Sequence, residues 1–199
     1  MADKPSQVID FLEDLSAKAM PFGRADMAEL TAFAKTELGL DALQSWDVAW
    51  ASEKLRQHRY AFSDQEVKQY FPEPVVLSGM FQVVERIYGI RVEPAEAEVW
   101  HPQVRYFRIA DADNATIGHF YIDLYARQTK RGGAWMDEAR SRRKLAAASG
   151  RPSTIQTPVA YLVCNFTPPA GGKPALLTHD EVTTLFHEFG HGPHHLLTR

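Results

Sequence analysis

The chain has 199 residues, of which 45% are hydrophobic and 24% charged, a composition typical of folded globular proteins. Its 22 Lys and Arg residues against 25 Asp and Glu residues give a net charge of -3, which provides no broad attraction to nucleic acid or to an anionic membrane. No run approaches the roughly 18 apolar residues of a membrane-spanning helix. The single cysteine, Cys164, and the lack of an apolar signal segment after Met1 predict a cytoplasmic protein without an internal disulfide.

Helical periodicity dominates the first half of the chain. Apolar residues recur at helical spacing over residues 8–15 and 27–38, and Gly39 then provides a C-cap. The pattern Ser63-x-x-Glu66 is a capping box that predicts a short helix. A further helix is predicted from Ser78 to Gly89, with its apolar residues facing inward.

After residue 98 the apolar pattern changes from helical to alternating. The runs VRYFRI (104–109) and HFYIDLYA (119–126) flank a polar turn and predict a hairpin, and VAYLVCNF (159–166) predicts a third strand. The intervening basic and glycine-rich segment, residues 127–156, has no sustained period, which predicts a long loop or a partly disordered segment. The expected fold is α+β, mainly helical, with a helical region over 1–98 and a small antiparallel sheet, long loop and final helix over 99–199.

The final helix is predicted to begin at Thr178, because Thr178-x-x-Glu181 is a capping box followed by an amphipathic stripe. It carries His187-Glu188-Phe189-Gly190-His191, an HExxH motif. Residues four apart on a helix lie about 40° apart around its axis, so both imidazoles can bind one zinc ion. Glu188 then lies close enough to take a proton from a water bound to that metal.

A zinc peptidase site needs a third protein ligand, which is not obvious in this sequence. His194 lies on nearly the same stripe, but about 10 Å along the axis from His187, so a packing or supporting role is favoured for it and for His195. Asp137 and Glu138 are loop carboxylates that are expected to be solvated.

Several blocks of the sequence resemble the thimet oligopeptidase family of zinc metallopeptidases, and within it the bacterial oligopeptidase A type. They are DVAW.SEK, WHP.VR.F, G.FY.DLYAR..KRGGAWM, PVAYL.CNF and GKPALLTHDEV.TLFHEFGH, and the resemblance extends from about Pro5 to Arg199. It implies that His187 and His191 are zinc ligands and Glu188 the catalytic base in hydrolysis of internal bonds of short peptides.

The same resemblance implies that this chain is an internal piece of a longer oligopeptidase. The third zinc ligand and the groups that polarise the scissile carbonyl would then lie after Arg199. At Pro193 the family usually has an apolar helix former. A proline there either bends the helix beyond the site or misplaces His191.

Substrate contacts are expected at a sheet edge beside the HExxH helix, where an extended peptide can pair with a strand. Residues 119–126 and 159–166 are the candidates, with the alternative that both strands are simply core. The resemblance also places Gly132, Gly133 and Ala134 near the substrate channel.

A different class of function, a metal-binding or interaction module without turnover, would be accompanied by large exposed apolar patches. A nucleic-acid site in the basic segment around Arg142 is disfavoured by the net charge. The oligomeric state is left open.

Overall fold

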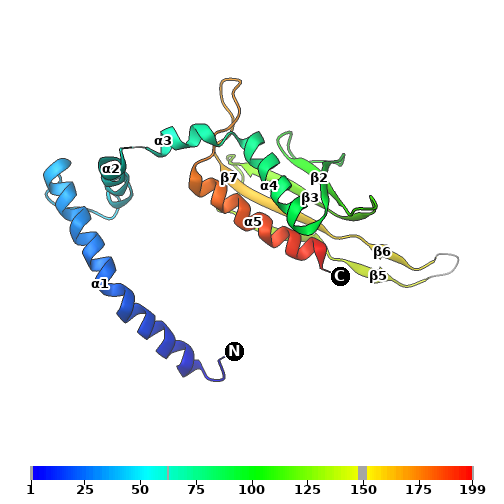
Figure 1. Ribbon diagram of the computed structural model, residues 1–199, viewed down its shortest axis with the longest axis horizontal. Coiled ribbons are helices and arrows are strands. Elements are labelled where there is room, and N and C mark those ends of the chain that lie inside the picture. Colours follow the sequence, from blue (N-terminus) through cyan, green and yellow to red (C-terminus); the bar gives the residue numbers. More distant parts are fainter. Residues whose placement is uncertain (1, 62, 148–151, 199) are drawn as a thin grey trace. The chain divides into compact units, whose positions relative to one another are not determined.

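A computed structural model describes residues 2–61, 63–147 and 152–198 (Figure 1). The chain forms two compact units, Met1–Ser63 and Asp64–Arg199, which are described separately. The α+β class predicted from the sequence is confirmed. None of the helices in the described residues has the length and apolar character needed to cross a membrane.

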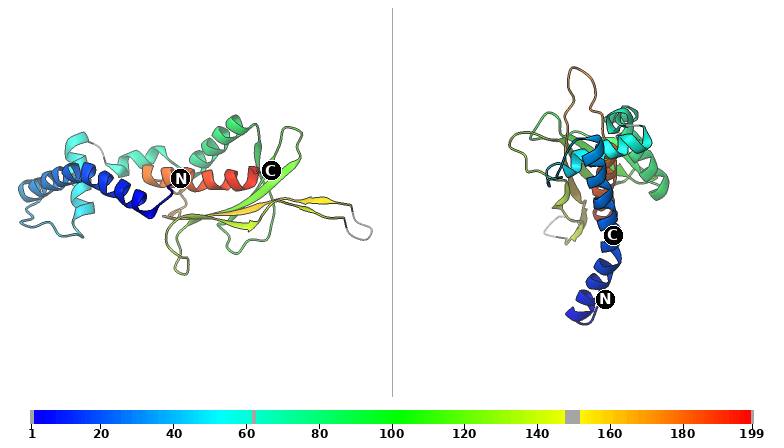
Figure 2. Two further views of the ribbon diagram at one scale, coloured as in Figure 1. Left: turned by 90° about the horizontal axis from the view of Figure 1, so that it is seen from below. Right: turned by 90° about the vertical axis from the view of Figure 1, so that its left-hand side faces the viewer.

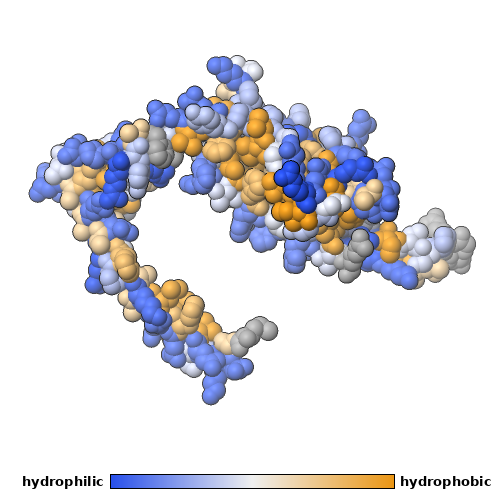
Figure 3. All heavy atoms as spheres, in the orientation of Figure 1, coloured by the Kyte–Doolittle hydropathy of each residue, from blue (hydrophilic) through white to orange (hydrophobic). Residues whose placement is uncertain are grey.

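The N-terminal unit is a pair of helices, α1 (Pro5–Glu37) and α2 (Val48–Tyr60). The two helical patterns predicted in residues 8–38 belong to one continuous helix, which ends where Gly39 takes a φ of 69°. The helices are joined by a ring contact between Phe33 and His58 and by an ion pair between Arg59 and Glu29. Much of α1 carries exposed apolar side chains (Figure 3), among them Val8, Ile9, Phe11, Leu12, Leu15 and Phe22.

The C-terminal unit begins with two short helical turns, α3 (Asp64–Val67) and η1 (Lys68–Tyr70), followed by α4 (Glu73–Tyr88). Helix α4 starts five residues before the predicted Ser78, because Pro74 occupies the first turn, where a missing N–H is tolerated. The carboxylate of Glu73 is buried and paired with Arg105, which ties the start of α4 to the sheet.

A five-stranded sheet has the order β1-β2-β3-β7-β4. Its strands are β1 (Arg91–Pro94), β2 (Arg105–Ala110), β3 (Thr116–Tyr125), β4 (Trp135–Arg140) and β7 (Val159–Phe166). The predicted hairpin is present as β2 and β3, and β7 has the predicted bounds. The sheet is mixed rather than antiparallel, because β3 and β7 run parallel.

The segment predicted as a loop, 127–156, contains three strands. Strand β4 pairs antiparallel with β7, and β5 (Arg143–Leu145) pairs with β6 (Thr154–Gln156) in a separate two-stranded ribbon. The loop prediction was wrong here because most side chains of these strands are exposed, which removes the apolar alternation that signals a strand. The edge strand β1 was also missed, because it has only four residues and none of them is fully buried.

Helices α4 and α5 (His179–Leu197) lie on the same side of the sheet (Figure 2). Alternate residues of the central strands point toward these helices and form the core. Its fully buried members include Met80, Ile109, Phe120, Ile122, Leu124, Leu162, Cys164, Leu177, Leu185 and Leu196. Helix α5 packs against β7, β3 and β4, so this core fixes the HExxH helix on the sheet.

Candidate metal centre and active site

Helix α5 is specified locally by its first turn and by its apolar stripe. The Thr178 hydroxyl accepts a hydrogen bond from the Glu181 N–H at 3.2 Å, and the Glu181 carboxylate accepts one from the Thr178 N–H at 2.8 Å. This is the predicted capping box. Leu185 and Phe189 are buried, and the Phe189 ring lies 5.5 Å from that of Phe120 on β3. The helix therefore has a fixed inner face, and the motif residues beside it have defined directions.

The two motif histidines converge on one point. The Nε2 atoms of His187 and His191 are 3.3 Å apart, and both side chains are exposed. Two imidazole nitrogens at about 2.05 Å from one tetrahedral zinc ion would be roughly 3.3 to 3.4 Å apart. The spacing of this pair therefore fits two ligands of a single zinc ion.

Glu188 is half-buried and does not share the direction of the histidine pair. Burial raises the pKa of the Cys164 thiol to about 12, and the nearby Glu188 carboxylate contributes to that rise. The Glu188 carboxylate is therefore close enough to Cys164 of β7 to act on it electrostatically, and in the sequence it directly follows His187.

No third ligand completes the pair among the described residues: no group of three His, Cys, Asp or Glu side chains is arranged to hold a metal there. His194 is exposed on the last turns of α5. Asp137 and Glu138, expected in a loop, are instead part of β4, and Glu138 contacts the Nδ1 of His195 at 3.2 Å. The Nε2 of His195 lies 3.1 Å from the Arg140 carbonyl oxygen, so His195 joins α5 to β4.

Pro193 lies inside α5, which continues to Leu197. The proline ring is buried and the histidine nitrogens keep their 3.3 Å separation. The two expectations for Pro193, a bend of the helix beyond the site and a displacement of His191, both stay predictions. The proline stays within the packed part of the helix.

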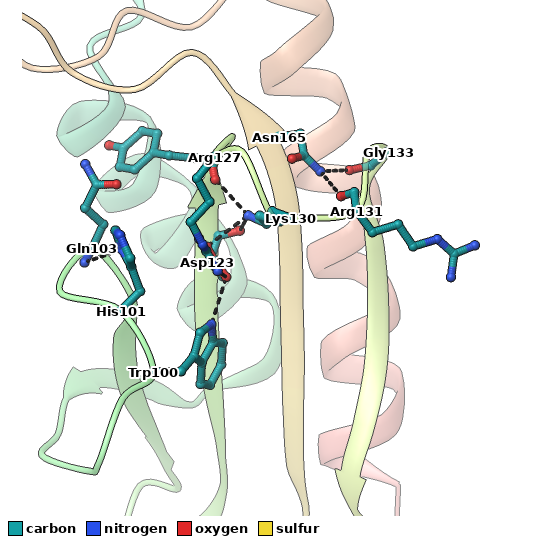
Figure 4. Close-up of polar contacts among 10 residues, drawn as sticks. Trp100, His101, Gln103, Asp123, Arg127, Lys130, Arg131, Gly133 and Asn165 are labelled. Atoms are coloured by element: carbon teal, nitrogen blue, oxygen red, sulfur yellow. Dashed lines mark hydrogen bonds and ion pairs between the residues drawn. The ribbon is translucent and has the colours of Figure 1, made fainter.

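The glycine segment Gly132, Gly133 and Ala134 leads directly into β4. Gly133 has a φ of 95°, which favours glycine, and a Cβ added at Gly132 or Gly133 would meet no heavy atom within 4 Å. The side-chain amide of Asn165 donates to the carbonyl oxygens of Arg131 at 2.8 Å and Gly133 at 2.6 Å (Figure 4). The segment is thus open to an approaching backbone and held from one side.

A cluster of charges lies just before this segment (Figure 4). Both guanidinium nitrogens of Arg127 donate to the buried carboxylate of Asp123, at 2.7 and 2.6 Å. Lys130 Nζ donates to the same carboxylate at 2.9 Å, and the Trp100 indole N–H does so at 3.1 Å. Burial by itself would raise the pKa of Asp123, but these donors lower it to about 2.

The two strands proposed for substrate pairing have no free edge. Strand β3 lies between β2 and β7, and β7 lies between β3 and β4. That prediction was wrong, and the alternative that both are core strands is the one the structure has. Strand β4 ends the sheet and packs along α5, so the edge beside the HExxH helix belongs to β4.

The sequence matches Peptidase family M3 over residues 1–199. The chain belongs to this family. It is 55% identical to oligopeptidase A of Escherichia coli over 200 residues, which cover 100% of this chain and 29% of that protein. It is 42% identical to the organellar oligopeptidase A of Arabidopsis thaliana, over 96% of this chain and 24% of that protein. It is 35% identical to the dipeptidyl carboxypeptidase of Escherichia coli, over 100% of this chain and 28% of that protein. The M3 chain therefore spans under a third of the length of these relatives, and the resemblance inferred from its sequence blocks is confirmed.

Sequence reasoning on the M3 chain missed Asp123, Lys130 and Asn165, which hold the glycine segment. One signal was available. Asp123 stands between the apolar residues Ile122 and Leu124, and a carboxylate in such a strand requires a partner when it is buried. Asn165 gave no comparable signal, because it lies more than thirty residues from the carbonyls that it binds.

Proposed function

We propose that this chain carries the HExxH segment of a zinc-dependent metallo-oligopeptidase that hydrolyses internal peptide bonds of short peptides in the cytoplasm. The observation that carries the proposal is the 3.3 Å separation of the His187 and His191 Nε2 atoms on one exposed helix face. Membership of peptidase family M3 and the similarity to oligopeptidase A support it. Both parts of the chain, 1–98 and 99–199, would then belong to one larger catalytic domain.

His187 and His191 would hold the zinc ion through their Nε2 atoms. When bound, zinc would polarise the scissile carbonyl and make a water molecule more acidic. Glu188 accepts the proton of the attacking water and returns it to the leaving amine. Glu188 directly follows the proposed ligand His187 on the same helix, which would put its carboxylate near the reacting atoms.

The peptide backbone would bind at the free edge of β4. An extended peptide can add to an exposed strand through main-chain hydrogen bonds without selecting a particular side chain. Gly132, Gly133 and Ala134 precede that edge, and the open space around the glycines supports a close approach of the substrate backbone. This is a binding mode suited to peptides of varied sequence.

A second candidate is a catalytically incomplete segment that binds metal or partners without turnover. Two observations favour it: no third ligand joins the histidine pair among the described residues, and α1 exposes a row of apolar side chains. A two-histidine site is expected to bind zinc weakly, because a third ligand and its supporting hydrogen bonds are needed for a well-formed centre.

Zinc titration by calorimetry tests the metal site. The chain is compared with His187→Ala, His191→Ala and Glu188→Gln, and with His194→Ala as a matched control on the same helix. We expect zinc binding to be lost in both motif-histidine variants and kept in Glu188→Gln and His194→Ala. Equal zinc binding by the wild-type chain and the His187→Ala variant would contradict the proposed site.

Hydrolysis of an internally quenched fluorescent peptide separates the two candidate functions. If the wild-type chain hydrolyses the peptide and Glu188→Gln does not, the isolated chain is an enzyme with its own third ligand. Zinc binding without turnover would support the incomplete segment, and turnover that persists in Glu188→Gln would exclude Glu188 as the base.

A further inference from the structure

The cluster around Asp123 lies outside the proposed metal site. Phe120, Ile122 and Leu124 of β3 belong to the core beneath the helices, so Asp123, in alternation with them, points to the opposite face of the sheet. There the Trp100 ring packs on Tyr121 at 5.2 Å between centroids. Asp123 therefore does not act on the reacting atoms directly. Its role lies in the residues that it holds in place.

Asp123 holds the loop through Lys130. The Lys130 side chain is only 4% exposed, and its ammonium donates to three acceptors: the Asp123 carboxylate at 2.9 Å and the carbonyl oxygens of Asp123 at 2.8 Å and Tyr125 at 2.9 Å. An ammonium has three N–H donors, so all of them are satisfied. A buried and fully bonded lysine of this kind fixes the chain on both sides of it, because leaving any of these groups unpaired is costly.

Asn165 holds the next part of the same loop. Its amide bridges the carbonyls of Arg131 and Gly133, the two residues on either side of Gly132. Gly132 and Gly133 are themselves exposed and touch little. Their position therefore depends on Lys130 before them and on Asn165 beside them, as Figure 4 shows for the labelled side chains.

We propose that Asp123 and Asn165 are positioning residues for the peptide-binding edge: together they hold the Gly132–Gly133 loop in the conformation in which it receives the substrate backbone. The inference rests on the proposed function of this loop and of β4. Asp123 acts through Lys130, and Asn165 acts through two backbone carbonyls. Neither residue touches the peptide.

The experiment uses the whole chain with two loop-releasing variants. Asn165→Asp keeps the size of the side chain but replaces the amide donor by an oxygen that repels both carbonyls. Lys130→Met removes the buried ammonium and leaves Arg127 and Trp100 bonded to Asp123. Asn114→Asp is the matched control, because Asn114 lies in the distant β2–β3 turn and its Oδ1 is an acceptor for Arg108, a role that aspartate retains.

Two readouts are compared, both in EDTA so that no metal-dependent hydrolysis contributes. Hydrogen exchange of amides 131–136 measures how firmly the loop is held. Fluorescence anisotropy of a labelled octapeptide measures binding. We expect Asn165→Asp and Lys130→Met to accelerate exchange and to weaken octapeptide binding by roughly tenfold each, the factor that corresponds to about 1.4 kcal/mol. Asn114→Asp should match the wild-type chain in both.

A purely structural role would lower overall stability and zinc affinity together with peptide binding. The expected result is instead an unchanged zinc affinity and an almost unchanged thermal midpoint in Asn165→Asp. Wild-type exchange rates in Asn165→Asp, or a loosened loop that binds the octapeptide as tightly as before, would overturn the inference. A wild-type chain that binds no octapeptide would overturn the proposed substrate role of the loop, while faster exchange in the two variants would still show that Asn165 and the Asp123–Lys130 pair hold the loop.

Discussion

Replacing Asp123 by Asn should destabilise the C-terminal unit in a way that depends on pH. The pKa of Asp123 is lowered from 3.8 to about 2, which corresponds to about 2 kcal/mol of stability. Because the folded-state pKa is the lower one, this contribution is present above about pH 4 and is lost as the pH falls toward 2. The substitution would also leave the Lys130 ammonium, 4% exposed, without its counter-charge, and breaking a buried pair costs about 3 to 5 kcal/mol.

We therefore expect Asp123→Asn to lower the free energy of unfolding by about 3 kcal/mol at neutral pH. Near pH 2.5 this loss should be smaller by about 2 kcal/mol. The assay is urea unfolding followed by tryptophan fluorescence. Trp46 and Trp50 are first replaced by Phe, so that Trp100 and Trp135 report only on the C-terminal unit. Asp113→Asn, in an exposed turn, is the control.

The double variant Asp123→Asn/Lys130→Met separates the orphaned ammonium from the lost carboxylate. It should recover part of the stability, because replacing both partners of a buried ion pair is tolerated better than removing one. A loss below about 1 kcal/mol at neutral pH, or a loss that stays constant down to pH 2.5, would refute the reasoning.

Two further substitutions, with Gly79→Ala in α4 as a comparison, test the packing of the HExxH helix. Pro193→Ala should raise the free energy of unfolding by about 1 kcal/mol. Removing a proline from a helix interior gains roughly 3 kcal/mol, and losing two buried methylenes costs roughly 1.6 kcal/mol. A lower urea midpoint would contradict this. Gly118→Ala should cost about 1 to 3 kcal/mol, because its Cβ would lie 3.0 Å from the Pro158 carbonyl oxygen and 3.2 Å from Leu196 on α5. Gly79→Ala in α4, where nothing lies within 4 Å, should instead gain up to about 1 kcal/mol, and equal urea midpoints for the two alanine variants would show that the close approach at Gly118 is unimportant.

The exposed apolar side chains matter for how the isolated chain behaves. On α1, the large apolar residues Phe11, Leu15 and Phe22 are each more than half exposed. They form a row rather than scattered positions, and such rows mark surfaces that associate. Measurements on this chain therefore need a parallel check of its association state.

The sequence by itself determined the elements whose bonds are local. The capping box of Thr178 and Glu181, the apolar stripe of α5 and the four-residue spacing of His187 and His191 all act within one or two helical turns, so the pattern predicts both the helix and the convergence of the imidazoles. The hairpin of β2 and β3 and the strand β7 were also predicted, the hairpin from its alternating apolar residues around a polar turn and β7 from its short apolar run.

Only the tertiary structure decided the arrangement of the proposed peptide-binding edge. Strand β4 has mostly exposed side chains, so its sequence has no apolar period, and its place beside β7 depends on backbone pairing that any residues can make. The parallel course of β3 and β7 likewise follows from where the chain returns, not from the residues of either strand. The bonds from Asn165 to the glycine loop join residues more than thirty positions apart, and a local pattern cannot specify a partner at that distance.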